Sequence, residues 1–204
     1  MPRRFSMIRS FQLADWITVG NAAAGVAALF AAMSYLQAPT EDWQLLAACA
    51  FIPLALVLDV LDGKVARWRH ESSVLGRELD SLADVISFGV APAAIAYAAG
   101  MQGGWDRIVL VYFVACGVSR LARFNVTAEK LAGEEGKVKY YEGTPIPTSI
   151  VLVAILAAAA WTGALGEDLW GGVWQLGPWQ LHPLALLFAV SGTLMISTLR
   201  IPKP

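Results

Sequence analysis

Charged residues are scarce in this 204-residue chain, and so are cysteine and histidine. Only 15% of the residues are charged, whereas 57% are hydrophobic, and the mean hydropathy is +0.56. This composition excludes an ordinary soluble domain and indicates a membrane protein. The net charge of −1 decides little by itself, and we expect no nucleic-acid partner.

The two cysteines and two histidines form no recognisable metal or redox motif. Cys49 and Cys116 lie inside apolar runs, with no C-x-x-C pattern and no histidine nearby, so we interpret them as small packing residues. His70 and His182 are too far apart in sequence to suggest a zinc site. The chain also lacks internal repeats, heptads and low-complexity tracts, which predicts one integral domain over residues 1–204.

Six apolar segments follow one another, each near the ~20 residues that a bilayer core of about 30 Å requires. They are residues 16–36, 43–65, 81–100, 108–125, 147–165 and 181–201. Residues 1–12 alternate arginines with apolar side chains, which predicts a short amphipathic helix on an anionic membrane surface. A signal peptide is the alternative, but Asp15 and Asn21 interrupt the apolar run that follows. We therefore predict an all-α integral membrane protein with six transmembrane helices.

The basic residues indicate the orientation of these helices. In a six-span arrangement fourteen lysines and arginines fall on one side and only Arg107 on the other, which predicts that both termini are cytoplasmic. Six tryptophans gather on the opposite side, as an interfacial aromatic belt would: Trp43, Trp105, Trp161, Trp170, Trp174 and Trp179. We expect a multi-pass protein of the cytoplasmic (inner) membrane.

Four aspartates stand beside these apolar segments in two pairs. Asp59 and Asp62 are three residues apart, and Asp80 and Asp84 are four apart, so on helices each pair projects from one face. A carboxylate at membrane depth costs several kcal/mol unless it is paired, hydrated or metal-bound. Oxygen-only ligands favour Mg²⁺ or Mn²⁺ over zinc. An antiparallel hairpin of the second and third helices would bring the pairs face to face, where they can hold two divalent ions roughly 4 Å apart.

The residues around the aspartates follow the pattern D-x-x-D-G-x-x-A-R, eight further residues, and G-x-x-x-D-x-x-x-D. The fixed positions are Asp59, Asp62, Gly63, Ala66, Arg67, Gly76, Asp80 and Asp84. This pattern closely resembles the motif of the CDP-alcohol phosphatidyltransferases, membrane enzymes that move a phosphatidyl group from a CDP-linked lipid to an alcohol. The alternative, acidic helix ends facing solvent, leaves the position beside apolar helices unexplained.

The resemblance implies roles for the aspartates and their neighbours. Asp59, Asp62 and Asp80 are the principal metal ligands, and Asp84 is both a ligand and the general base that takes the proton of the incoming hydroxyl. The small residues of the motif let the nucleotide approach the helix backbone. We expect the following residues to bind the CDP-lipid: Thr18, Asn21, Gly63, Ala66, Arg67, Ser73 and Gly76. Of these, Gly76 is expected at the turn into the third helix, while Thr18 and Asn21 match an opening motif in which Ala14 and Asp15 replace the usual proline and asparagine.

Three further stretches resemble the phosphatidylserine synthase branch of the family: residues 81–93, 119–126 and 142–149. Arg120 and Arg123 lie three apart near the end of the fourth segment, and an arginine there faces a polar cavity or extends to headgroups. We expect them to bind the serine carboxylate, assisted by Asn125 and Ser87. The branch carries leucine and alanines where this chain has Thr144, Thr148 and Ser149.

The resemblance thus implies transfer from CDP-diacylglycerol to L-serine, with Mg²⁺ or Mn²⁺ as cofactor, by a homodimer. A phosphorylated acceptor, glycerol 3-phosphate or an inositol phosphate, is an alternative that Lys137 or Lys139 would serve. From another class, a divalent-cation transporter would need a path through the bilayer, yet the acidic residues gather at one end. A membrane scaffold would not need the motif.

Overall fold

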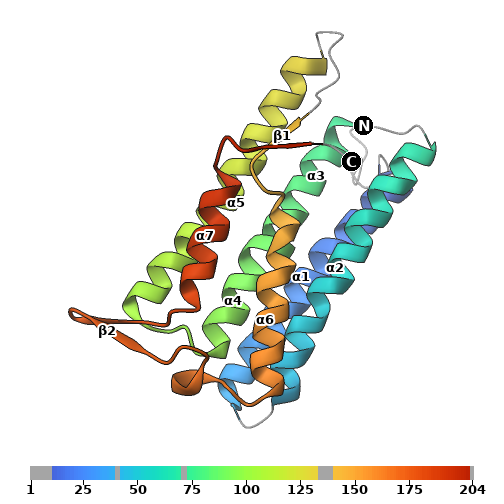
Figure 1. Cartoon of the computed structure of the whole chain (residues 1–204). Helices are drawn as coiled ribbons and strands as arrows, with labels where there is room; N and C mark the ends of the chain where they lie inside the picture. The colour runs from blue at the N-terminus through green and yellow to red at the C-terminus, as the bar shows by residue number, and fades with distance from the viewer. Residues whose placement is uncertain (1–10, 40–41, 70–72, 133–139, 203–204) are drawn as a thin grey trace, which may run out of the picture.

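The computed structural model of the chain is a bundle of long helices whose axes run in nearly the same direction (Figure 1). It describes residues 11–39, 42–69, 73–132 and 140–202. The predicted amphipathic helix over residues 1–12 lies almost entirely outside this part of the chain, as do His70, Lys137 and Lys139. Among the described residues, the strands are limited to two short antiparallel pairs.

The first four apolar segments form long helices, as predicted. They are α1 (Leu13–Gln37), α2 (Asp42–Arg69), the continuous helical run α3 (Val74–Asp84), η2 (Val85–Val90) and α4 (Ala91–Ala99), and α5 (Gly104–Ala132). By length and hydropathy, four spans within the described residues suit a membrane: Leu13–Gln37, Asp42–Arg69, Val74–Ala99 and Gly104–Val126. The protein is therefore helical and multi-pass.

The last two apolar segments form shorter helices than expected. A 3₁₀ turn, η3 (Ile146–Ser149), leads into α6 (Ile150–Trp161), and α7 covers only Ala185–Met195. The predicted sixth segment, 181–201, was wrong at both ends because Leu181 belongs to strand β3 and Arg200 begins strand β4. Six membrane crossings therefore do not follow from helix length alone.

Two short strand pairs lie at opposite ends of the bundle (Figure 1). β1 (Tyr140–Glu142) pairs with β4 (Arg200–Pro202), and β2 (Trp174–Leu176) pairs with β3 (Trp179–Leu181) in a tight hairpin. The second pair lies between the fifth and sixth predicted segments, apart from Leu181, with which the sixth was expected to begin. We call the end of the bundle with β2 and β3 the tryptophan end, because Trp43, Trp105, Trp161, Trp174 and Trp179 lie on elements that meet there and all are exposed.

Alanines let the first helix pack closely into the bundle. Ala24, Ala28 and Ala32 recur along one face of α1 and are almost completely buried. Small residues bring helix backbones together, and van der Waals contact then replaces a hydrophobic driving force that lipid cannot supply. The principal neighbour of α2 is therefore α1, which also packs along α3. α1 also contacts both helices of the predicted hairpin, α2 and α3 (Figure 1).

Candidate active site

The four motif aspartates lie at the end of the bundle opposite the tryptophans, which we call the aspartate end. Asp59 and Asp62 belong to the last turns of α2, and Asp80 and Asp84 to the last turns of α3. One carboxylate oxygen each from Asp59, Asp62 and Asp80 lies within 4.8 Å of the others. Asp84 is beside them, since its carboxyl is within the electrostatic reach of Asp59 and Asp80. The predicted meeting of the two pairs is confirmed.

These carboxylates are shielded from solvent but have few hydrogen-bond donors. Asp62 and Asp84 are buried, at 6% and 8% exposure, and Asp59 and Asp80 are partly buried. Thr18 donates to Asp62 Oδ2 at 2.6 Å, and the Asn21 amide reaches Asp84 Oδ1 at 3.5 Å. Within the described residues, the side-chain partners of Asp59 are the carboxyls of Asp80 and Asp84.

Such a group of carboxylates needs positive charge nearby. Like charges at this separation repel one another, and the repulsion grows where the surroundings exclude water. The donor set consists of oxygens alone, which is the chemistry of a hard divalent cation rather than of zinc or copper. The three converging oxygens therefore fit a divalent metal ion.

A cavity of about 370 Å³ opens beside the carboxylates. Asp62 and Asp80 form part of its wall, so a molecule in the cavity would reach the candidate metal ligands. Five of the seven residues that the sequence assigned to the CDP-lipid also line it: Thr18, Gly63, Ala66, Ser73 and Gly76. They come from α1, α2 and the beginning of α3.

The two motif glycines in the cavity wall have different neighbours. A side chain at Gly63 would point at the Arg67 guanidinium, because an added Cβ would lie 3.5 Å from Arg67 Nη1. Arg67 thus folds back over the glycine, although it does not itself line the cavity. Gly76 was expected at a turn but lies in the first turn of α3, where its N–H donates to Ser73 Oγ at 2.8 Å. Ser73 is therefore the N-cap of this helix as well as part of the cavity wall.

The segment after Asp84 winds as a π-helix, η2, which the sequence did not predict. Ser87 in this segment is fully buried, and its hydroxyl donates to the Asn21 carbonyl oxygen at 2.9 Å. Gly25 permits the contact, because a Cβ there would come within 2.6 Å of Ser87 Oγ. The π-helical turn changes the direction of the side chains around Asp84, and such turns are frequent at functional sites. The structure therefore brings Ser87 against α1.

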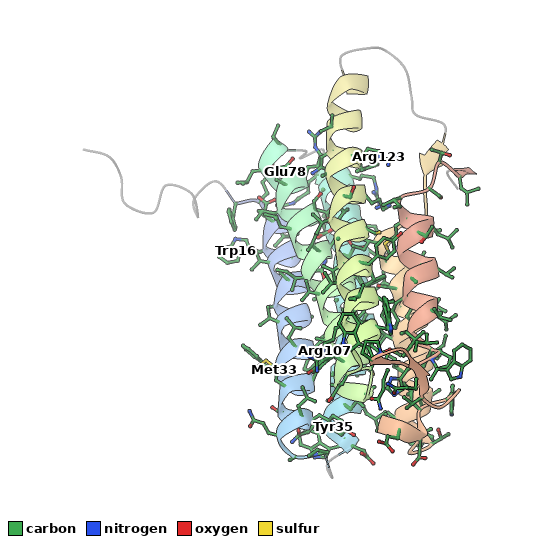
Figure 2. All side chains as sticks on the ribbon, turned by 90° about the vertical axis from the view of Figure 1, so that its left-hand side faces the viewer. Trp16, Met33, Tyr35, Glu78, Arg107 and Arg123 are labelled. Carbon is green, nitrogen blue, oxygen red and sulfur yellow. The ribbon has the colours of Figure 1, made fainter. Side chains whose placement is uncertain are left out.

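The remaining residues of the expected acceptor site lie on α5. Arg120 is partly buried and Arg123 is exposed; Figure 2 labels Arg123 at the same end of the bundle as Glu78. The Asn125 amide donates to Ser81 Oγ at 3.1 Å and to Glu78 Oε2 at 3.3 Å, so it links α5 to α3. Ser81 directly follows Asp80, and this link holds α3 beside α5.

Sequence reasoning missed one acidic residue of the site, Asp15. It was treated only as a departure from the family motif and as an interruption of an apolar run. The structure places it in the cavity wall at 2% exposure, and its Oδ2 accepts the Gln12 N–H at 2.8 Å. A signal was present, because Asp15 precedes Thr18 by one helical turn and lies on the same face.

Comparison with known proteins agrees with this site. A family model described as CDP-alcohol phosphatidyltransferase matches residues 11–194. A CDP-diacylglycerol–serine O-phosphatidyltransferase of Saccharomyces cerevisiae is 43% identical over 98% of this chain and 74% of its own length. A protein of the same name from Mycobacterium leprae is 36% identical over 76% of this chain and 48% of its own. An archaetidylserine synthase of Methanothermobacter thermautotrophicus is 34% identical over 94% of this chain and 70% of its own.

Proposed function

Because the chain belongs to the CDP-alcohol phosphatidyltransferase family, we propose that it transfers the phosphatidyl group of CDP-diacylglycerol to L-serine, giving phosphatidylserine and CMP. The observation that carries the proposal is the convergence of Asp59, Asp62 and Asp80 within 4.8 Å beside a cavity of about 370 Å³. The names of the yeast and mycobacterial relatives support serine as the acceptor. The archaeal relative is also named for a serine-containing product.

The proposed cofactor is Mg²⁺ or Mn²⁺, with two ions held by Asp59, Asp62, Asp80 and Asp84. When bound, the ions supply positive charge that neutralises the diphosphate and stabilises the attacking and leaving oxygens. The donor chemistry of the cluster supports hard cations. The remaining work, orientation and proton transfer, belongs to the side chains of the chain.

Asp84 is the proposed general base. It lies one turn beyond Asp80 along α3, and the Asn21 amide donates to its Oδ1 at 3.5 Å. Asp84 takes the proton of the serine hydroxyl as that oxygen attacks the phosphorus of the lipid-side phosphate. A bond forms between the serine oxygen and phosphorus, the bond from phosphorus to the CMP oxygen breaks, and CMP leaves. This is direct displacement, without a phosphatidyl-enzyme.

The substrates are proposed to occupy the two sides of the carboxylates. Thr18, Gly63, Ala66, Ser73 and Gly76 line the cavity and hold the CDP part, with Asn21 and Arg67 nearby. On the α5 side, Arg120 and Arg123 provide the positive charge for the serine carboxylate. Arg120 is the more buried of the two and is therefore expected to contribute more.

The proposed arrangement in the cell places the aspartate end in the cytoplasm, where a nucleotide-linked lipid and serine are available. Six crossings of the inner membrane, with both termini cytoplasmic, follow from the fourteen-to-one distribution of basic residues. The exposed tryptophans at the other end support this orientation, because they suit a membrane interface. Residues 1–204 form one domain in this proposal, and the enzyme is a homodimer.

The experiment that tests the function is an acceptor screen with purified full-length protein. CDP-diacylglycerol and Mg²⁺ or Mn²⁺ are supplied with radiolabelled serine, glycerol 3-phosphate or an inositol phosphate in parallel. We expect label from serine alone to enter the lipid fraction, with one CMP released per phosphatidylserine. Transfer to a phosphorylated acceptor in place of serine would reassign the substrate. No CMP release with any acceptor, from protein that remains folded, would contradict the enzyme and favour a transporter or scaffold.

A further inference from the structure

Asp15 is a fifth carboxylate at the aspartate end, and it does not belong to the group of three that could hold a metal ion. It lies on α1, whereas the candidate metal ligands lie on α2 and α3. Thr18, which follows Asp15 by about one turn, donates to Asp62. Since one turn rises about 5.4 Å, Asp15 lines the cavity one turn of α1 away from the carboxylates that face the cation.

The two oxygens of Asp15 have different surroundings. Oδ2 accepts the Gln12 N–H at 2.8 Å, an interaction that caps the beginning of α1. Oδ1 faces Gly76, where an added Cβ would come within 2.9 Å of it. Among the described residues, no donor is hydrogen-bonded to Oδ1. Asp15 is 2% exposed and lines the cavity, so a ligand in the cavity can provide a donor to this oxygen.

Gly76 makes this oxygen accessible. A side chain there would collide with Asp15 Oδ1 and would also approach Ser73 Oγ at 3.1 Å. The glycine lies in an ordinary helical turn, so its backbone does not require the absence of a side chain. The space beside Asp15 is therefore what glycine preserves at this position.

We propose that Asp15 Oδ1 accepts a hydrogen bond from the nucleoside of the CDP-lipid and so determines which nucleotide the cavity takes. The inference rests on the proposed function, because a diphosphate bound at Asp62 and Asp80 leaves the nucleoside in the rest of the cavity. Two donors of cytidine have the required chemistry, the cytosine 4-amino group and the ribose 2′-hydroxyl, and carboxylates accept hydrogen bonds from both. Uracil presents an oxygen in place of the amino group, and a carboxylate repels it.

Asp15→Asn separates nucleotide recognition from helix capping. The asparagine oxygen can still accept the Gln12 N–H, while its amide presents a donor to the cavity in place of an acceptor. The matched control is Asp42→Asn, the same exchange in the first turn of α2 at the other end of the bundle. Calorimetry measures the binding of CDP, UDP and 2′-deoxy-CDP to full-length protein in detergent with Mn²⁺.

We expect the wild-type protein and Asp42→Asn to prefer CDP by tenfold or more over UDP, 2′-deoxy-CDP or both. Asp15→Asn should bind CDP at least tenfold more weakly. If Asp15→Asn no longer prefers CDP over UDP, the donor is the cytosine amino group. If it no longer prefers CDP over 2′-deoxy-CDP, the donor is the 2′-hydroxyl. The same CDP affinity and the same preferences in Asp15→Asn and wild type would overturn the inference, as would a wild-type protein that binds no CDP.

The serine-transfer assay is read separately, so that the two claims can fail independently. Normal transfer together with unchanged preferences in Asp15→Asn would leave the proposed function intact and reject the role of Asp15. Nucleotide preference that depends on Asp15, without transfer to serine, would support its role and contradict the serine acceptor.

Discussion

Asp106 at the tryptophan end and the four motif aspartates at the aspartate end differ in how fully their carboxylates are hydrogen-bonded. At the tryptophan end, Asp106 near the beginning of α5 is completely buried. It accepts hydrogen bonds from the backbone N–H groups of Gly103 at 2.9 Å and His182 at 2.8 Å. Its Oδ2 also lies 2.7 Å from Nδ1 of the His182 ring. At the aspartate end, the side-chain donors from the described residues are one hydroxyl, Thr18 to Asp62 at 2.6 Å, and one amide, Asn21 to Asp84 at 3.5 Å.

The difference separates structural acids from functional ones. Asp106 has its partners within the protein, and it fixes the chain before α7 to the start of α5 where the β2–β3 hairpin packs. Gly103 and Gly104 leave no room for side chains there, since added Cβ atoms would meet Gln180 and the Trp179 ring. Among the described residues, the aspartate cluster has fewer such partners for its carboxylates, and carboxylates of this kind beside a cavity are suited to a cation and a substrate.

Removal of divalent cations should have the largest effect, because it acts on the aspartate end alone. We expect phosphatidyl transfer to disappear in excess chelator and to return when Mg²⁺ or Mn²⁺ is added back, since the clustered carboxylates and the diphosphate both require neutralisation. The readout is CMP release at saturating serine. Full activity in excess chelator would contradict the metal-dependent mechanism. As a control, the thermal unfolding midpoint is measured with and without chelator, and an unchanged midpoint would show that the chelator does not unfold the rest of the bundle.

Asp84→Asn should have the second-largest effect on activity. We expect a loss of about 10²- to 10⁴-fold in kcat, the usual contribution of a general base. Asp59, Asp62 and Asp80 remain, so we expect the variant to retain most of its affinity for Mn²⁺ and CDP-diacylglycerol. The measurement pairs calorimetry of the CDP-lipid with kcat at saturating serine. A near-normal kcat would remove Asp84 as the base.

Thr18→Val removes the hydroxyl that orients Asp62 while it keeps the shape of the side chain. Partners of metal ligands typically contribute 10- to 100-fold in metal affinity or activity, so we expect a loss within that range. Mn²⁺ titration of activity provides the readout. Thr18→Ser, which restores the donor, should recover most of the loss. If the serine variant is as impaired as the valine variant, the hydrogen bond is not the cause.

Asp106→Asn should change transfer least and stability most. Asparagine provides a single neutral acceptor oxygen where Asp106 presents two charged ones, and a hydrogen bond to a charged group contributes about 1.5–3 kcal/mol. We expect a lower thermal unfolding midpoint in detergent, followed by circular dichroism, with kcat near wild type below that midpoint. Asp168→Asn, an exposed acid at the same end, is the control. A large loss of kcat in folded Asp106→Asn would contradict this expectation, because it would show that the tryptophan end affects catalysis at the aspartate end.

The aspartate site could be predicted because it depends on the spacing of residues that are close together in the sequence. The spacing of Asp59 with Asp62 and of Asp80 with Asp84 gives each pair one helix face, and long apolar runs require helices at both places. Their convergence is confirmed. Thr18 was also expected near the site, although its specific partner, Asp62, depends on how closely α1 packs.

Features that depend on packing between distant segments were not predictable. No local pattern indicated that η2 would wind as a π-helix, because this turn accompanies the close contact of Ser87 with Gly25. The short α7 ends where β4 pairs with β1, a contact between segments about sixty residues apart. Asp106 and His182 are likewise remote in sequence, so nothing before the structure suggested that each would be the other's partner.

The most direct test of the difference between the two ends is Mn²⁺ binding, measured by electron paramagnetic resonance with CDP present, in wild type, Asp59→Asn and Asp106→Asn. Asp59→Asn removes one of the three converging carboxylates, whereas Asp106→Asn changes a carboxylate whose partners lie within the protein. We predict that Asp59→Asn binds Mn²⁺ at least tenfold more weakly and that folded Asp106→Asn binds it as wild type does. Equal Mn²⁺ affinity in all three proteins would contradict the account.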